Sequence, residues 1–163
     1  MSVRRYEQRD ARRVWALSTL PKIGRTADPT MPLDLLLPEG PPPAFPHLAN
    51  IEIGFHAAGG DFLVVEREGY LVGMGGIRPN TSQQAEILHV RVHPATRRQG
   101  IGRKIMSALE HRALELGFQE LHLDTATNQP EAVAFYEGLG YIRLGEETRP
   151  EWSWTLVFFT KQL

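Results

Sequence analysis

Cysteine is absent from the 163-residue sequence. Its absence excludes disulfide bonds, zinc sites built from thiolates and an acyl-cysteine intermediate in any reaction that the protein catalyses. Net charge is nearly absent as well, since 18 basic and 19 acidic residues leave a formal charge of −1 at pH 7. A near-neutral protein gives no electrostatic reason to expect DNA or RNA as its main partner.

Long hydrophobic runs are missing too. No stretch approaches the ~18 apolar residues that cross a membrane, and residues 1–6 lack the apolar core of a signal peptide. The six histidines show no spacing that is typical of a metal site. We therefore expect a protein of the cytoplasm that has no membrane partner, no nucleic-acid partner and no bound metal.

Proline is abundant in one place only. Eight of the twelve prolines fall within residues 21–48, the proline-rich segment. Because proline lacks a backbone donor, this segment cannot be a helix or an inner strand. Two interpretations stay open, a surface loop and one wall of a substrate site. Residues 31–37 are too apolar for a free linker, so we expect them to pack onto a single domain that spans residues 1–163.

The hydrophobic pattern predicts a mixed α/β domain with the order β-α-α-β-β-β-α-β-α-β-β. An early meander of strands gives way to a parallel crossover. The expected strands lie at residues 3–7, 62–66, 70–77, 85–93, 120–125, 141–147 and 152–161. The expected helices lie at residues 10–20, 51–57, 100–116 and 130–139.

The turn between the strand at 85–93 and the helix at 100–116 indicates a phosphate ligand. Gly100 and Gly102 allow backbone N–H groups to approach a ligand closely, and the start of the helix adds unpaired N–H groups with a positive partial charge. Arginine side chains surround these glycines. A Walker loop is absent, and Ile105 occupies the place where a dinucleotide-binding turn has its third glycine. The turn alone therefore predicts an anion such as a pyrophosphate and no more.

The surroundings of the turn are more specific. A Val-x-Val-x-Pro strand at residues 90–94 leads into Arg-x-x-Gly-x-Gly at residues 97–102, which resembles the acetyl-CoA-binding motif of the GNAT acetyltransferase superfamily. About 30 residues further on, residues 128–141 resemble the second signature of that superfamily, in which Asn precedes a helix that carries Phe-Tyr and ends in Leu-Gly-Tyr. The resemblance implies a twisted mixed sheet of six to seven strands, flanked by about four helices.

The same resemblance implies acetyl-CoA as co-substrate, an amine as acceptor, and roles for particular residues. Glu86 is the candidate base that takes the proton of the amine, unless it is an ordinary strand glutamate. Tyr136 is the candidate acid that protonates the leaving thiolate, unless it only packs against its neighbours. The implied contacts to acetyl-CoA are Val90, whose N–H would polarise the thioester carbonyl, Arg91, Val92, Arg97, Arg98, Gln99, Gly100, Ile101, Gly102, Arg103, Asn128 and Tyr136.

The acceptor is not fixed by these motifs. A small-molecule amine is the leading interpretation, and a protein lysine or N-terminus is the alternative. A module that binds acyl-CoA without catalysis is a third, and a homodimer is compatible with all of them. Asp124 is either a group that orients the amine or the end of a strand. Trp152 and Trp154 share a face of the expected last strand, where core packing is favoured over a place in the acceptor pocket.

Overall fold

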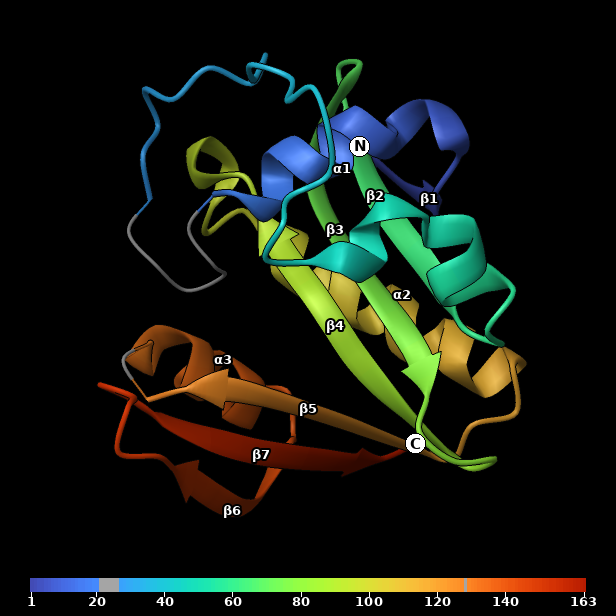
Figure 1. Ribbon diagram of the computed structural model, residues 1–163, viewed down its shortest axis with the longest axis vertical. Helices are drawn as coiled ribbons and strands as arrows, with labels where there is room; N and C mark the ends of the chain where they lie inside the picture. The colour runs from blue at the N-terminus through green and yellow to red at the C-terminus, as the bar shows by residue number, and fades with distance from the viewer. Residues whose placement is uncertain (21–26, 128) are drawn as a thin grey trace.

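The computed structural model describes residues 1–20, 27–127 and 129–163. In this part of the chain the strands form one mixed sheet with the order β1-β2-β3-β4-β5-β7-β6 (Figure 1). The strands are β1 (Ser2–Arg5), β2 (Asp61–Arg67), β3 (Tyr70–Pro79), β4 (Gln84–Val92), β5 (Glu120–Ala126), β6 (Ile142–Thr148) and β7 (Thr155–Gln162). The α-helices are α1 (Ala11–Ser18), α2 (Ile101–Glu115) and α3 (Pro130–Gly138). Short helical turns are η1 (Gln8–Asp10), η2 (Pro46–Ala49), η3 (Glu52–His56) and η4 (Pro94–Thr96).

The predicted meander and parallel crossover are confirmed. Strands β1 to β4 are antiparallel neighbours, and α2 carries the chain to β5, which runs parallel to β4. The parallel pairing is short, because it joins only residues 84–86 to residues 120–122. Beyond these pairs β4 and β5 separate, and Figure 1 shows the two strands diverging from their common end. This divergence opens a gap in the middle of the sheet.

Apolar side chains cover both faces of the sheet. Helices α2 and α3 pack on one face through residues such as Ile105, Leu109 and Val133. Helix α1 and η3 pack on the other face, where Val14 and Phe55 are fully buried. The alternation of side chains along each strand produces this division, since successive residues point to opposite faces. The predicted mixed α/β class is therefore confirmed.

Residues 27–48, the described part of the proline-rich segment, pack onto the rest of the chain, as the apolar residues at 31–37 predict. Leu33 and Leu35 lie against the two cores, although Leu36 is 96% exposed. Backbone carbonyls of the segment accept hydrogen bonds from the rest of the chain, one from Trp15 Nε1 to Leu48 at 2.8 Å. In agreement with the proline content, residues 27–48 contain no α-helix and no strand, and the single 3-10 turn η2 begins at the end of the segment with a proline at a position that needs no backbone donor.

Two other expected elements differ from the structure. The helix expected at residues 51–57 is the single π turn η3, preceded by η2. The last strand starts at Thr155, so Trp152 and Trp154 precede it. Their rings stack with centroids 5.8 Å apart, and Trp154 is 36% exposed. The core-packing interpretation of these two tryptophans is therefore wrong.

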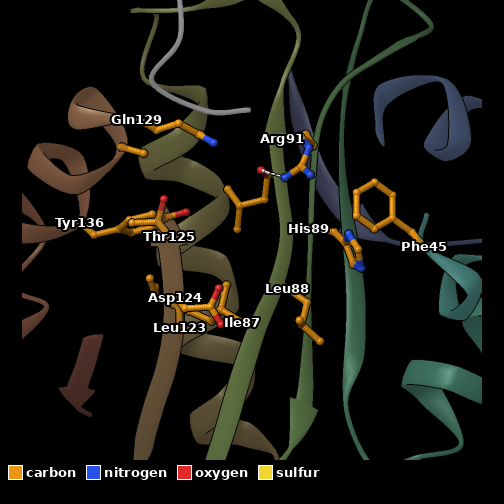
Figure 2. A pocket seen from close by; sticks show the side chains of 12 residues that line it. Phe45, Ile87, Leu88, His89, Arg91, Leu123, Asp124, Thr125, Gln129 and Tyr136 are labelled. Atoms are coloured by element: carbon orange, nitrogen blue, oxygen red, sulfur yellow. Dashed lines mark hydrogen bonds between the residues drawn. The ribbon is translucent and has the colours of Figure 1, made fainter. Parts of the chain in front are cut away.

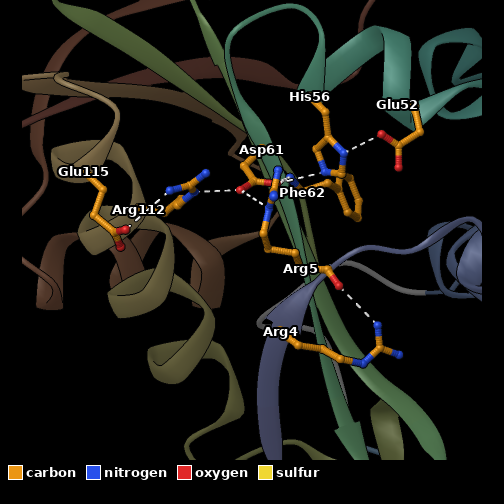
Figure 3. Close-up of polar contacts among 8 residues, drawn as sticks. All are labelled: Arg4, Arg5, Glu52, His56, Asp61, Phe62, Arg112 and Glu115. Atoms are coloured by element: carbon orange, nitrogen blue, oxygen red, sulfur yellow. Dashed lines mark hydrogen bonds and ion pairs between the residues drawn. The ribbon is translucent and has the colours of Figure 1, made fainter.

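A buried carboxylate joins three elements at the edge of the domain (Figure 3). Asp61 is fully buried at the start of β2. Its Oδ2 accepts hydrogen bonds from Arg112 of α2 at 2.7 Å and from Arg5 of β1 at 2.8 Å. His56 Nε2 lies 2.8 Å from Oδ1 of the same carboxylate. A buried charge is stable only when it is compensated in this way.

Candidate active site

The gap between β4 and β5 holds a cavity of about 190 Å³. Residues 87–91 of β4 form one wall and residues 123–125 of β5 form the other. Tyr136 and Ala132 of α3 close the side toward the helices, and Phe45 of the proline-rich segment lies on the opposite side. Figure 2 shows Tyr136, Thr125 and Asp124 along one side of the gap and Arg91, His89 and Phe45 along the other.

A bulge in β4 shapes the wall of this cavity. Gly76 of β3 pairs with Leu88, whereas Met74 pairs with Arg91, so β4 carries one extra residue between these pairs. His89 lies in the bulge with a φ of 57°, a left-handed conformation that a non-glycine residue adopts at some cost. Because β5 pairs only with residues 84–86, no described strand pairs with the edge of residues 87–92 that faces the gap.

The turn before α2 forms a second hollow, of about 490 Å³. Arg98 and Gly100 both adopt positive φ angles, 62° and 82°, and Gly100 is the N-cap of α2. A Cβ atom built on Gly100 would meet nothing within 4 Å, so the backbone faces open space. Such a turn at a helix N-terminus presents N–H groups to an anion. Glu131 and Phe135 of α3 line the other side of the hollow.

Most of the residues predicted to contact acetyl-CoA gather around these two hollows. Val90 and Arg91 line the first, whereas Val92, Arg97, Arg98, Gly100, Ile101, Gly102 and Arg103 line the second. Arg97 is only 8% exposed, and its Nη2 donates to the carbonyl of Val92 at 3.5 Å. Gln99 is exposed and accepts a hydrogen bond from Arg67. Asn128 lies outside the described residues.

Glu86 precedes Ile87, which lines the first cavity, but is not itself one of the lining residues. In the sheet it is paired with Arg78 of β3 and, in the short parallel pairing, with His122 of β5. Burial and the neighbouring carboxylate of Asp124 raise the pKa of Glu86, because both disfavour its charged form. Asp124 itself lines the cavity. Two acidic groups therefore lie at the narrow end of the gap.

Tyr136 is 6% exposed and belongs to the residues that line the cavity. Burial raises the pKa of Tyr136, with the nearby guanidinium of Arg91 acting in the opposite direction. The phenol is thus protonated at neutral pH and can donate a proton or a hydrogen bond.

No group of three or more potential metal ligands occurs in the described part of the chain. Among the same residues, no helix is long and apolar enough to cross a membrane.

The chain is similar to known proteins in both sequence and fold. The model of the acetyltransferase (GNAT) family matches residues 29–141. The uncharacterised N-acetyltransferase YjgM of Escherichia coli (strain K12) is 35% identical over 101 residues, 60% of this chain and 60% of the relative. A GNAT acetyltransferase from Staphylococcus aureus has the same fold, with a TM-score of 0.76 at 16% identity over 99% of this chain and 98% of that one.

A further solved structure carries the donor molecule. YncA of Salmonella typhimurium, solved with its cofactor acetyl-CoA, has a TM-score of 0.71 and 21% identity over 100% of this chain and 94% of that one. The family model covers more than half of this chain. The chain belongs to the GNAT acetyltransferase family. At identities this low, the two solved structures show the likeness of the fold alone.

Membership of the GNAT family confirms the family resemblance carried by the turn at residues 97–102 and by the helix that holds Tyr136. Some residues that line the first cavity are not among those that the sequence motifs predict. Phe45 comes from the proline-rich segment, which has no helical or strand periodicity to place it. Gln129 directly follows the Asn of the second signature, and this adjacency is a signal that could have found it.

Proposed function

We propose that this chain is an acetyl-CoA-dependent N-acetyltransferase whose acceptor is a small-molecule amine. One observation carries the proposal: the unpaired edge of β4 at residues 87–92 faces a cavity that also holds Tyr136. An extended ligand can pair with such an edge like an added strand. Membership of the GNAT family and the acetyl-CoA bound to YncA support this ligand as the donor.

The two hollows suit the two ends of acetyl-CoA. In our proposal the N–H groups at Gly100 and Gly102 hold the pyrophosphate, with charge from Arg98 and Arg103, which are both exposed at the turn. Val92 pairs with the pantetheine arm, and Val90 N–H donates to the thioester oxygen. Gln129 also has a role in this proposal. Its buried Oε1 has no hydrogen-bond partner in the described part of the chain and can accept a hydrogen bond from the pantetheine amides.

The reaction follows from these positions. The amine nitrogen forms a bond to the thioester carbon while the carbon–sulfur bond breaks, and Val90 N–H stabilises the negative charge that develops on the carbonyl oxygen. Glu86 takes a proton from the amine through one water molecule. Tyr136 gives its hydroxyl proton to the departing thiolate and regains a proton from solvent. The raised pKa of Glu86 makes it a stronger base than an exposed glutamate.

The size of the cavity favours a small acceptor over a protein. Its volume of about 190 Å³ is below the ~300–1,000 Å³ that is typical of sites for drug-sized ligands. Phe45, the N-cap of η2, also lines the cavity on the side that lies away from α3. A peptide chain would have to displace Phe45 to place a lysine at Val90.

Release of free thiol from acetyl-CoA tests the proposal directly. The protein is incubated with acetyl-CoA and a panel of amino acids, polyamines, aminoglycosides and a lysine peptide, and N-acetylated products are identified by mass spectrometry. We expect at least one small amine to release thiol well above the rate without acceptor, and the peptide to release none. If acetyl-CoA binds in calorimetry but no acceptor releases thiol, the chain is a binding module and the proposal is wrong.

A further inference from the structure

Arg91 is a buried cation that has no acidic partner in the part of the chain that the structure describes. It lies on β4 in the wall of the cavity between β4 and β5, where we place the acceptor, and is only 7% exposed. Its Nη1 donates to the carbonyl of Val90 at 2.9 Å, and its guanidinium carbon lies 5.9 Å from the centre of the Phe45 ring. Its Nε is buried and has no hydrogen-bond partner among residues 1–20, 27–127 and 129–163. Within the described residues, Arg91 forms no ion pair with a carboxylate.

Burial of Arg91 in this way reduces the stability of the fold. A guanidinium stays charged in nearly all environments, so its burial requires a compensating anion or a full set of acceptors. Burial lowers the pKa of Arg91, and the nearby charge of Arg97 lowers it further. Tyr136 lies close to Arg91 but is a neutral phenol at neutral pH. The chain thus keeps a destabilising charge in the wall of its cavity, which is typical of a functional site.

The charges along the cavity have opposite signs at its two ends. Asp124 lines the narrow end, close to Glu86, where β4 and β5 still pair. Arg91 lies further along β4, where the strands have separated. Val90, to which we assign the thioester contact, is the direct neighbour of Arg91 in the chain. A ligand that carries both an amine and an anionic group would match this distribution of charge.

We propose that the acceptor is an amino carboxylate of the amino-acid class, held by a charge-assisted hydrogen bond from its carboxylate to the guanidinium of Arg91. This inference rests on the proposed acetyltransferase function and adds the chemical class of its acceptor. The backbone of residues 90–92 serves the donor, and the Arg91 side chain serves the acceptor. Arginine suits this role, because its planar donors bind a carboxylate in a defined orientation.

Matched acceptors test the pairing. Phenylalanine is compared with phenylethylamine, and lysine with cadaverine, so that each pair differs only by the carboxylate. We expect wild-type kcat/KM to be about 10- to 100-fold higher for the amino acids, the range of a charge-assisted hydrogen bond. The variant Arg91→Met is expected to lose this preference through a higher KM for the amino acids only, and Arg91→Lys to regain part of it. KM is measured at saturating acetyl-CoA, with the affinity for acetyl-CoA taken from calorimetry for each variant, so that the comparison reports on the acceptor alone.

A stability measurement distinguishes a ligand-binding role of Arg91 from a purely structural one. If Arg91 compensates a ligand rather than the fold, Arg91→Met removes an unpaired buried charge and should raise the midpoint of thermal unfolding. Arg143→Gln is the matched control, because Arg143 is a half-exposed arginine that pairs with Glu137 at the protein surface. We expect this control to keep the preference for amino acids.

Binding without turnover separates this inference from the proposed function. In the presence of CoA, N-acetylphenylalanine is titrated into wild-type protein and into Arg91→Met. We expect binding to wild type and a loss of at least tenfold in the variant, even if no acceptor in the panel releases thiol. Equal use of amines and amino acids by wild type, an equal loss for both in Arg91→Met, or no binding of the acetylated amino acid would overturn the inference.

Discussion

His47 and His89 contact each other through their Nε2 atoms, which joins η2 to the bulge of β4. Phe45 packs edge-on against the same His89 ring, with centroids 5.1 Å apart. The end of the proline-rich segment is therefore attached to the wall of the cavity between β4 and β5 rather than to the turn before α2. Any change in this contact should affect the acceptor more than the donor.

The variant His47→Ala tests this separation. It removes one hydrogen bond, whose net contribution of about 0.5–1.5 kcal/mol corresponds to a loss of roughly two- to tenfold in affinity. We expect KM for the acceptor to rise by about that factor while the dissociation constant of acetyl-CoA stays the same. Steady-state kinetics and calorimetry measure the two quantities. His111→Ala is the control, since His111 lies exposed on α2, where it contacts Glu115 of the same helix. A weaker binding of acetyl-CoA by His47→Ala would contradict the prediction.

Two histidines predict how stability depends on pH. Burial lowers the pKa of His47, with a further contribution from Arg78, and burial also lowers the pKa of His93. The unfolded chain then binds more protons than the folded one as the pH falls below about 6.5. The free energy of unfolding should therefore decrease from pH 7 downward until the lowered pKa values are reached. Thermal unfolding at pH 7.5, 6.5 and 5.5 measures the effect, and a double variant His47→Gln/His93→Gln should reduce the slope.

The pair Glu86 and Asp124 predicts the acidic limb of the pH–rate profile. The base acts when it is deprotonated, so kcat/KM should fall as the pH decreases through the raised pKa of Glu86. Asp124→Asn removes one of the two causes of the shift and should move this limb to lower pH. Glu86→Gln should abolish the limb and reduce kcat/KM by about 100-fold, within the range of general base catalysis. If both variants keep the wild-type profile, Glu86 is not the base.

The sequence predicts the parts of the fold that depend on local patterns. Helical spacing from Ile101 to Leu109 and the glycines around Gly100 predict α2 and the turn before it, because helix periodicity and positive φ angles are local properties. The order of the strands along the chain follows from the same local patterns. The parallel pairing of β4 with β5 follows from the crossover helix between them.

The shape of the cavity could not be predicted in the same way. His89 in the bulge has a positive φ angle, and the sequence has no glycine or turn residue at this position that would predict the bulge. The position of Phe45 depends on long-range contacts of the proline-rich segment, such as the hydrogen bond from His93 Nε2 to the carbonyl of Pro32. The alternation around Trp152 suggested a strand, yet the ladder with β6 begins only at Thr155. Each of these features is fixed by contacts between distant residues.

Tyr136→Phe tests the role of the phenol as an acid. The change keeps the aromatic ring that packs against Phe135 and Tyr141, so folding should be unaffected. A thiol with a pKa near 8.5 gives a fair leaving group without assistance, and the loss in kcat should therefore be limited to about 10- to 100-fold. KM for both substrates should change little. Single-turnover kinetics isolate the chemical step, and a full rate in that experiment would remove Tyr136 from the mechanism.

The carboxylate of Asp61 should be essential to stability without being part of the site. Loss of a buried ion pair costs about 3–5 kcal/mol, and the lower value applies here because Arg5 and Arg112 can regain water when the carboxylate is removed. We expect Asp61→Asn to lose about 3 kcal/mol, or roughly 6–12 °C in the thermal midpoint. Glu115→Gln, which removes an exposed partner of Arg112, should change stability by less than about 0.5 kcal/mol.

Acid titration checks the same ion pair by a second route. Burial opposes ionisation of Asp61, but the hydrogen bonds from Arg112, the backbone of Phe62 and Arg5 outweigh it and lower its pKa. The stability that these bonds provide is present above the unfolded pKa of about 3.9 and is lost as the pH falls through the lowered pKa. Wild type should therefore lose stability below pH 4 more steeply than Asp61→Asn. Parallel curves for the two proteins would mean that the carboxylate is not ionised in the folded state, and the compensation by Arg5 and Arg112 would have to be abandoned.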